Sequence, residues 1–130
     1  ESFRQEWPGD QATLLLLSDV QVATAERSLW KQDLLQIIIT HGTDTLVETA
    51  CYLGHRAGNL ATKRICLTGA MLPEKFVDTD AHFNMGVCFG ALDTAMPGIY
   101  VCMNGRVRQW TSVRRDLKSG IFTQALDSGS

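Results

Sequence analysis

Apolar residues in this chain come in short runs that alternate with longer stretches of helical periodicity. The runs have the length of buried strands and are bounded by polar residues, glycine or proline; they cover residues 14–17, 37–40, 64–70 and 99–103. Between them, apolar positions three and four residues apart predict helices over residues 25–35, 44–56 and 81–94. Thr24 and Asp80 are expected to cap the first and the last of these helices.

The repeated alternation of strands and helices predicts the fold class. We expect a three-layer α/β domain, doubly wound and mostly parallel, of the flavodoxin or Rossmann type. No linker divides the chain, so residues 1–130 are interpreted as one domain. At its ends, residues 1–11 are polar with a turn at 7–10, and residues 123–130 are expected to form a frayed tail.

Some finer features of the domain are also predicted. Asn104-Gly105 is a hairpin turn signal, so residues 106–108 are expected to pair back as a short edge strand. Small residues in helix 81–94 would permit close packing on the sheet: Gly86, Gly90 and Ala91. Three larger residues are interpreted as core or pocket wall: Tyr52, Met71 and Phe83.

Composition narrows the possible functions. The chain is 45% hydrophobic with a net charge of −2, which suits a globular domain and gives no electrostatic basis for binding nucleic acid or an anionic membrane. No apolar run approaches the roughly 20 residues of a membrane span. The four cysteines form no C-x-x-C pair, so we expect buried free thiols in a reducing compartment and no metal site: Cys51, Cys66, Cys88 and Cys102.

The clearest candidate site is the turn that follows the strand at 37–40. Residues 41–45 read His-Gly-Thr-Asp-Thr, and they lie where a parallel strand is expected to give way to a helix. Ligands of open α/β sheets bind beyond the carboxyl ends of the strands, where Thr43 and Asp44 would offer a hydroxyl, a carboxylate and free N–H groups. The structural alternative is that Thr43 or Asp44 only caps the helix, because threonine and aspartate are both favoured caps.

Several motifs in order along the chain resemble the L-asparaginase family, in particular its short, single-domain bacterial members. Residues 37–50 look like the family's T-H-G-T-D-T signature with the E-T-A helix that follows it. Residues 67–71 are similar to its T-G-A-M strand end, residues 78–84 to its S-D-A-x-F-N loop, and residues 98–105 to its G-V-Y-I-x-M-N-G strand. The resemblance covers about residues 18–122.

This resemblance implies an amidohydrolase that converts the side-chain amide of asparagine to aspartate and ammonia through threonine chemistry. Thr43 would be the family's second catalytic threonine and would activate or position water. Asp44 would bind the α-amino group of the substrate and share a proton relay with a lysine. Gly42 and Ala70 would complete the matching part of the substrate-binding set. The resemblance also implies a homo-oligomer. No cofactor is expected, and the reducing compartment indicated by the cysteines predicts a cytoplasmic location.

The chain departs from the family pattern at three points. The T-G-G-T segment that carries the first threonine is absent, which suggests that the first βα unit is missing. The relay lysine is replaced by Arg115, which could hold charge but not transfer a proton, and Lys118 is a possible substitute. The serine that would bind the substrate α-carboxylate is replaced by Val20, although Gln21 could donate a hydrogen bond and Ser18 is another possible counterpart.

Two interpretations therefore stay open. One is an asparaginase-type enzyme acting on a small amino-acid amide, asparagine or glutamine. The other is a non-catalytic protein of the same fold that binds a small amino acid or serves as an oligomer partner. A nucleotide-binding module is weakly supported, because the turn at residues 41–43 lacks both phosphate-binding glycine patterns; flavin use would rest on fold analogy alone.

Overall fold

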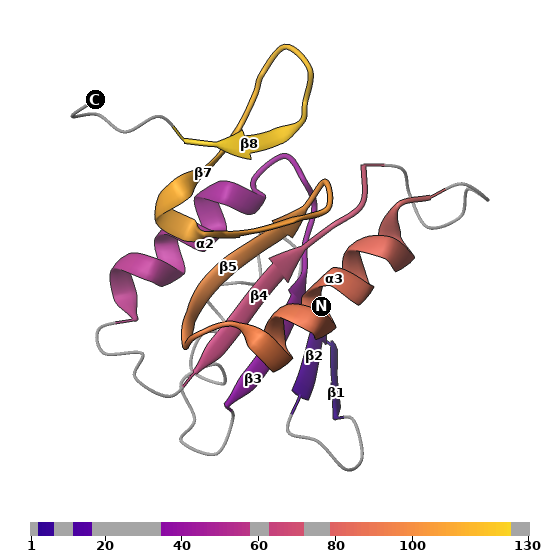
Figure 1. The fold of residues 1–130 in the computed structure, drawn as a ribbon, viewed down its shortest axis with the longest axis vertical. Coiled ribbons are helices and arrows are strands. Elements are labelled where there is room, and N and C mark those ends of the chain that lie inside the picture. Colours follow the sequence, from indigo (N-terminus) through magenta and orange to yellow (C-terminus); the bar gives the residue numbers. More distant parts are fainter. Residues whose placement is uncertain (1–2, 7–11, 17–34, 58–62, 72–78, 126–130) are drawn as a thin grey trace.

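The computed structural model describes residues 3–6, 12–16, 35–57, 63–71 and 79–125. Its main feature is a six-stranded sheet with the strands in sequential order (Figure 1). The strands of this sheet are β1 (Phe3–Glu6), β2 (Ala12–Leu16), β3 (Gln36–Thr40), β4 (Arg64–Thr68), β5 (Gly98–Met103) and β6 (Arg106–Gln109). The described helices are α2 (Leu46–Arg56), α3 (Ala81–Thr94) and the short 3₁₀ helix η2 (Trp110–Ser112).

The four central strands, β2 to β5, run parallel, and the outer two are antiparallel to their neighbours. The β-branched run Ile37–Ile39 is wholly buried in β3, as expected for a strand covered on both faces. The expected edge strand at 106–108 is confirmed as β6. No strand was predicted among residues 1–11, but residues 3–6 pair with β2 as strand β1. The turn expected at 7–10 and the helix expected at 25–35 lie outside the described residues.

Alternate side chains of the sheet face two different cores. On one face, α2 packs with Leu46, Ala50 and Leu53 against the odd-numbered residues of β3, β4 and β5. On the other face, α3 packs with Cys88, Ala91 and Leu92 against the even-numbered residues Ile38, Cys66, Tyr100 and Cys102. The expected three-layer, mostly parallel α/β architecture is therefore confirmed. Neither described helix is both long and apolar enough to cross a membrane.

The arrangement of α2 and α3 requires one connection of unusual hand. The chain steps one strand in the same direction from β3 to β4 and from β4 to β5. Two right-handed connections of this kind would place both helices on one face, yet α2 and α3 lie on opposite faces. In Figure 1, α3 crosses in front of the sheet while the chain steps leftward, so the β4–α3–β5 connection is the left-handed one.

Several side chains of the two helices lie differently from the expectation. Gly86 and Gly90 are exposed, and a Cβ atom at either position would have no neighbour within 4 Å, so they do not serve packing on the sheet. Ala91 does face the sheet. Phe83 is 63% exposed and Tyr52 37% exposed, which corrects their assignment to the core. Met71 is partly buried against the core under α2, as expected.

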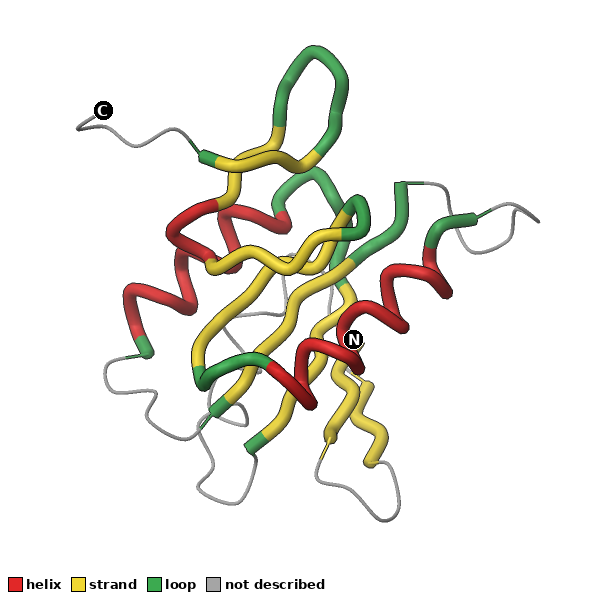
Figure 2. The backbone as a smooth tube through the Cα atoms, in the orientation of Figure 1, coloured by secondary structure: helices red, strands yellow, loops and turns green. Residues whose placement is uncertain are grey.

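A second, two-stranded sheet follows η2. Strands β7 (Val113–Arg115) and β8 (Phe122–Gln124) are antiparallel, and the loop between them projects beyond the main sheet (Figure 2). Phe122 is 1% exposed and belongs to the core under α2, which ties this hairpin to the domain. The frayed tail was expected to begin at residue 123, but Thr123 and Gln124 belong to β8; residues 126–130 lie outside the described part.

All four cysteines are free thiols. Three of them meet in the core under α3, where hydrogen bonds to Cys102 and Cys88, together with burial, raise the pKa of the Cys66 thiol. Cys51 on α2 is only partly buried, and its pKa is raised by burial and then by the charge of Glu48.

This difference predicts selective alkylation. In the native protein we expect iodoacetamide to modify Cys51 alone, at a rate that still rises with pH beyond the usual thiol pKa because only the thiolate reacts. The other three thiols should react only after unfolding in urea. Mass spectrometry of the labelled peptides measures this, and native labelling of Cys66 or Cys102 would contradict the buried cluster.

Candidate functional site

The His-Gly-Thr-Asp-Thr turn leaves the sheet at the carboxyl end of β3, beside the end of β4. Its first residue is fixed to the neighbouring strand, because the His41 N–H donates to the Thr68 carbonyl at 2.8 Å. Helix α2 begins at Leu46 with Thr45 in the cap position, and no side chain caps it. Neither Thr43 nor Asp44 is therefore the helix cap, so capping does not explain this pair. The buried Thr45 hydroxyl has no partner among the described residues.

The imidazole of His41 stabilises this turn through contacts of both ring nitrogens. His41 is buried, and its Nδ1 lies 2.8 Å from the Gly42 carbonyl while its Nε2 lies 2.9 Å from the Thr49 hydroxyl. A carbonyl can only accept a hydrogen bond, so Nδ1 carries a proton and donates to the Gly42 carbonyl, while Nε2 is hydrogen-bonded to the Thr49 hydroxyl. The turn is thus connected to the first turn of α2 as well as to β4.

The end of β4 approaches the same turn closely at Gly69. A Cβ atom at this position would overlap the His41 carbonyl oxygen and would lie 3.2 Å from the Thr43 methyl group. Only glycine lets the two strand ends come this near. Close approach at Gly69 therefore sets the distance between the Thr43 turn and Ala70.

A buried polar network holds the other side of the β4 end. Asn84, which is 1% exposed, donates from Nδ2 to the Gly69 carbonyl at 2.8 Å and to Asp80 Oδ2 at 3.0 Å. The same Asp80 oxygen accepts from the Met71 N–H at 3.0 Å. Asp80 is the N-cap residue of α3, as expected, but its side chain makes no capping bond and instead fixes the loop after β4.

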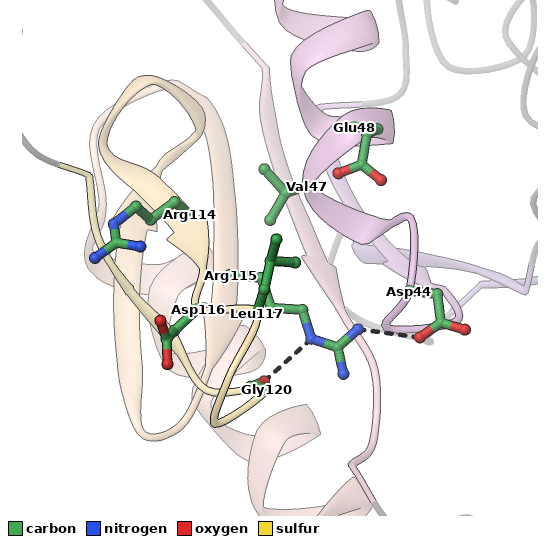
Figure 3. Close-up of a pocket in the computed structure, with 8 residues that line it drawn as sticks. All are labelled: Asp44, Val47, Glu48, Arg114, Arg115, Asp116, Leu117 and Gly120. Carbon is green, nitrogen blue, oxygen red and sulfur yellow. Dashed lines mark hydrogen bonds and ion pairs between the residues drawn. The ribbon is translucent and has the colours of Figure 1, made fainter.

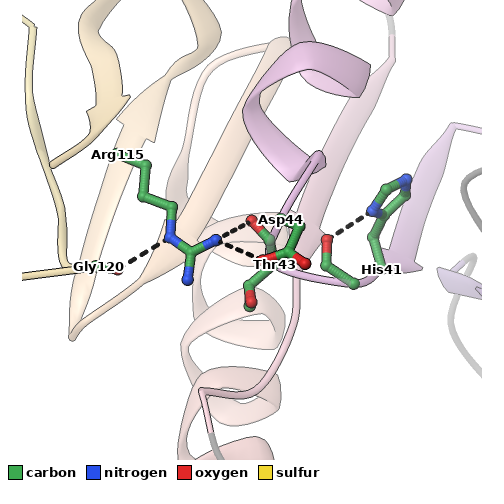
Figure 4. A network of polar contacts seen from close by, with 6 residues as sticks. His41, Thr43, Asp44, Arg115 and Gly120 are labelled. Atoms are coloured by element: carbon green, nitrogen blue, oxygen red, sulfur yellow. Dashed lines mark hydrogen bonds and ion pairs between the residues drawn. The ribbon is translucent and has the colours of Figure 1, made fainter. Parts of the chain in front are cut away.

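Arg115 on β7 reaches across to the Thr43–Asp44 pair (Figure 4). One guanidinium nitrogen, Nη1, donates to the Thr43 carbonyl at 2.9 Å and to Asp44 Oδ1 at 3.1 Å. Its Nε donates to the Gly120 carbonyl at 3.1 Å, so the hairpin itself orients the group. The Arg115 side chain is 23% exposed, whereas that of Asp44 is 92% exposed. The carboxylate therefore keeps most of its surface available for a ligand.

A cavity of about 670 Å³ opens beside this contact (Figure 3). One wall is the start of α2, with Val47 and Glu48, and the other is the hairpin β7–β8. Both apolar and charged side chains line it: Asp44, Val47, Glu48, Arg114, Arg115, Asp116, Leu117 and Gly120. A volume of this size is typical of small-molecule sites.

The residues singled out from the sequence are only partly brought together here. The turn holds Gly42, Thr43 and Asp44, and the Arg115 side chain contacts it. Ala70 is partly buried and directly follows Gly69, where the end of β4 approaches the turn closely. Lys118 is exposed in the hairpin loop and does not line the cavity. Val20, Gln21 and Ser18 lie outside the described residues.

Sequence reasoning missed the rest of the cavity wall. Glu48 could have been found, because it lies four residues after Asp44 at the start of the same predicted helix. Arg114, Asp116 and Leu117 carried no such signal, since the hairpin that places them was itself unexpected. Within the described ranges, no group of three or more histidine, cysteine or acidic side chains is arranged to hold a metal ion.

Comparison with known proteins identifies close similarity over most of the chain. Residues 19–122 match the family model described as Asparaginase, N-terminal. The L-asparaginase of Thermococcus kodakarensis is 35% identical over 79 residues, which is 61% of this chain and 24% of that protein. The glutaminase-asparaginase of Pseudomonas fluorescens is 33% identical over 103 residues, which is 75% of this chain and 26% of that protein.

Solved structures agree. The thermostable L-asparaginase of Thermococcus kodakarensis superposes with a TM-score of 0.65 at 29% identity, covering 81% of this chain and 32% of that one. The probable cytoplasmic L-asparaginase of Campylobacter jejuni has the same TM-score at 24% identity and 33% coverage of its own length, a likeness that shows the fold. The chain thus spans about a quarter to a third of the length of these relatives.

Proposed function

Because the chain belongs to the asparaginase family, we propose that its Gly42–Asp44 turn forms part of an asparaginase-type amidohydrolase site, which converts L-asparagine and water to L-aspartate and ammonia. The observation that carries this proposal is the contact of the Arg115 guanidinium with both members of the Thr43–Asp44 pair at the edge of the cavity. It joins the two segments that the motif resemblance had assigned to one site, although they are 71 residues apart.

In this proposal the Asp44 carboxylate binds the α-amino group of the substrate. The exposed carboxylate would form a charge-assisted hydrogen bond with the ammonium group, while Arg115 holds it from the other side. The side-chain amide of the substrate would then face Thr43. Gly42 and Ala70 would line the same crevice, with Val20 and Gln21 assigned to the substrate α-carboxylate by the resemblance.

The chemical step assigned to Thr43 is hydrolysis of the C–N bond of that amide. The hydroxyl would position water for attack on the carbonyl carbon, or attack that carbon itself, and the amide nitrogen would leave as ammonia with the proton released by the attacking oxygen. In the second case an ester forms on Thr43, and water would then hydrolyse this ester to release L-aspartate and restore the hydroxyl. Backbone N–H groups of the turn would stabilise the negative charge that develops on the carbonyl oxygen. Arg115 cannot transfer a proton, so its charge would only position the Asp44 carboxylate. Lys118 would transfer protons in its place if the hairpin loop brings it to the cavity.

The second candidate is a non-catalytic protein that binds a small amino acid in the same crevice. The observation that favours it is Arg115 itself, because a guanidinium fixes charge where the family uses a lysine that can exchange a proton. A cytoplasmic location and self-association belong to either form of the proposal, as does the absence of a cofactor.

The test is calorimetric titration with L-aspartate and L-asparagine, run beside an ammonia-release assay on the wild type and on Thr43→Val. We expect both ligands to bind and Thr43→Val to lower the rate of ammonia release at least about 100-fold with little change in aspartate affinity. Thr111→Val is the matched control, because Thr111 is exposed in η2 away from the cavity. Binding without ammonia release would select the non-catalytic candidate, and no binding at millimolar ligand would reject both.

A further inference from the structure

The turn between β5 and β6 is connected to the hairpin that carries Arg115. Asn104 and Gly105 both adopt left-handed backbone conformations, with φ of 55° and 74°. Such a pair is typical of a two-residue hairpin turn, and asparagine tolerates the first position better than most residues. The Asn104 side chain also makes a long-range contact: its Oδ1 accepts the Phe122 N–H at 2.7 Å.

Phe122 in turn contacts Arg115. The two residues are direct cross-strand partners in the β7–β8 sheet. The Phe122 ring is buried in the core under α2, and the Arg115 guanidinium carbon lies 5.5 Å from its centroid, within the range of a cation–π contact. The Phe122 N–H is directed to Asn104 and not to β7, so the hydrogen bond fixes β8 to the main sheet and leaves the hairpin ladder intact.

We propose that Asn104 is a positioning residue, which anchors β8 through the Phe122 N–H and thereby holds the Arg115 guanidinium against Thr43 and Asp44. The role rests on the proposed function of the Thr43–Asp44 site. It uses two properties of asparagine at once, tolerance of the left-handed backbone and a side-chain acceptor. Asn104 itself does not line the cavity, so its effect on a ligand must pass through the hairpin.

Two substitutions separate these properties. Asn104→Gly keeps the turn conformation at no steric cost but removes the acceptor. Asn104→Asp keeps both, because aspartate tolerates the same conformation and its carboxylate oxygen can accept the N–H. Any effect of Asn104→Gly that Asn104→Asp does not share therefore reports the hydrogen bond to Phe122.

The first measurement does not depend on activity. In a proton–nitrogen NMR spectrum, the wild type and Asn104→Asp should show a slowly exchanging Arg115 Nε–H, because it is bonded to the Gly120 carbonyl, together with a protected Phe122 amide. In Asn104→Gly the Phe122 amide should exchange at least about 10-fold faster and the Nε–H signal should be lost. Equal protection in all three proteins would overturn the proposal.

The second measurement is a double-mutant cycle on aspartate affinity. Asn104→Gly should weaken binding about 5- to 10-fold in the wild type and should have no further effect in an Arg115→Gln background, because the two act through one path. An equal loss in both backgrounds would show that Asn104 acts in another way. If the wild type binds no aspartate and releases no ammonia, the proposed function fails, and the NMR comparison still decides the positioning role.

Discussion

Substitution of Gly69 by alanine is expected to lower the free energy of unfolding by about 3 kcal/mol, at the upper end of the range for an inserted methyl group. The added Cβ would overlap the carbonyl oxygen of His41, a backbone atom that cannot rotate away, and would press on the Thr43 methyl group. Relief requires the ends of β3 and β4 to separate, so the His41–Thr68 hydrogen bond should lengthen too. We therefore also expect Gly69→Ala to abolish ligand binding at the Thr43 turn.

The matched control is the same substitution on the outer face of α3. Gly90→Ala adds a methyl group where no atom lies within 4 Å, and alanine favours helix by about 1 kcal/mol over glycine. It should therefore raise the free energy of unfolding by about that amount. Urea unfolding followed by circular dichroism measures both variants. Opposite signs are the expected result, and a neutral effect of Gly69→Ala would refute the close approach.

Asp44→Asn is expected to separate binding from stability. The Asp44 side chain is largely exposed, and an exposed ion pair such as that with Arg115 contributes at most about 1 kcal/mol to folding. Removal of the carboxylate should cost much more in ligand binding, because an ammonium group held in the site loses its charged partner. A bound ligand would cover Asp44, and loss of one partner of a covered charge pair costs about 2–5 kcal/mol, so aspartate affinity should fall at least about 30-fold.

Glu48→Gln tests whether this loss is specific to Asp44. Glu48 is an exposed acidic residue of the same cavity, one helical turn further along α2. Its neutralisation changes the net charge by the same amount but leaves the contact with Arg115 in place. We expect aspartate affinity to change less than about 3-fold by calorimetry. If the two variants lose affinity equally, general charge in the cavity, and not the Asp44 carboxylate, is responsible.

Periodicity was sufficient to predict the central sheet because each of its strands is apolar on both faces. The run Ile37–Ile39 could only be a buried strand, and the motif that follows it located the Thr43–Asp44 turn. The same approach failed at the ends of the chain. Residues 3–6 contain a single apolar residue, Phe3, and Val113–Arg115 has only three residues, so neither segment shows an apolar period. Both become strands through pairing with partners supplied by the tertiary structure.

Residue type also gave wrong predictions where one residue type can serve two different structural roles. Glycines in a helix can signal close packing or simple exposure, and Gly86 and Gly90 are exposed while Gly69, outside any helix, makes the close approach. Arg115 was singled out by its position in a motif, and its contact with Thr43 and Asp44 spans two separate sheets, which no local pattern encodes. The buried network of Asn84 likewise depends on two segments, the end of β4 and the start of α3, that meet only in the folded chain.

The reversed hand of the β4–α3–β5 connection has a consequence for where a ligand can bind. In most doubly wound sheets a crevice forms at the topological switch point, where the strand order turns back on itself. Here the strand order never turns back, yet the helix after β3 lies on one face of the sheet and the helix after β4 lies on the other. Their divergence has the same effect as a switch point, and the Thr43–Asp44 turn, which borders the cavity, lies beside it. A search based on strand order would overlook this place in the sheet, because its position is determined by the hand of one connection.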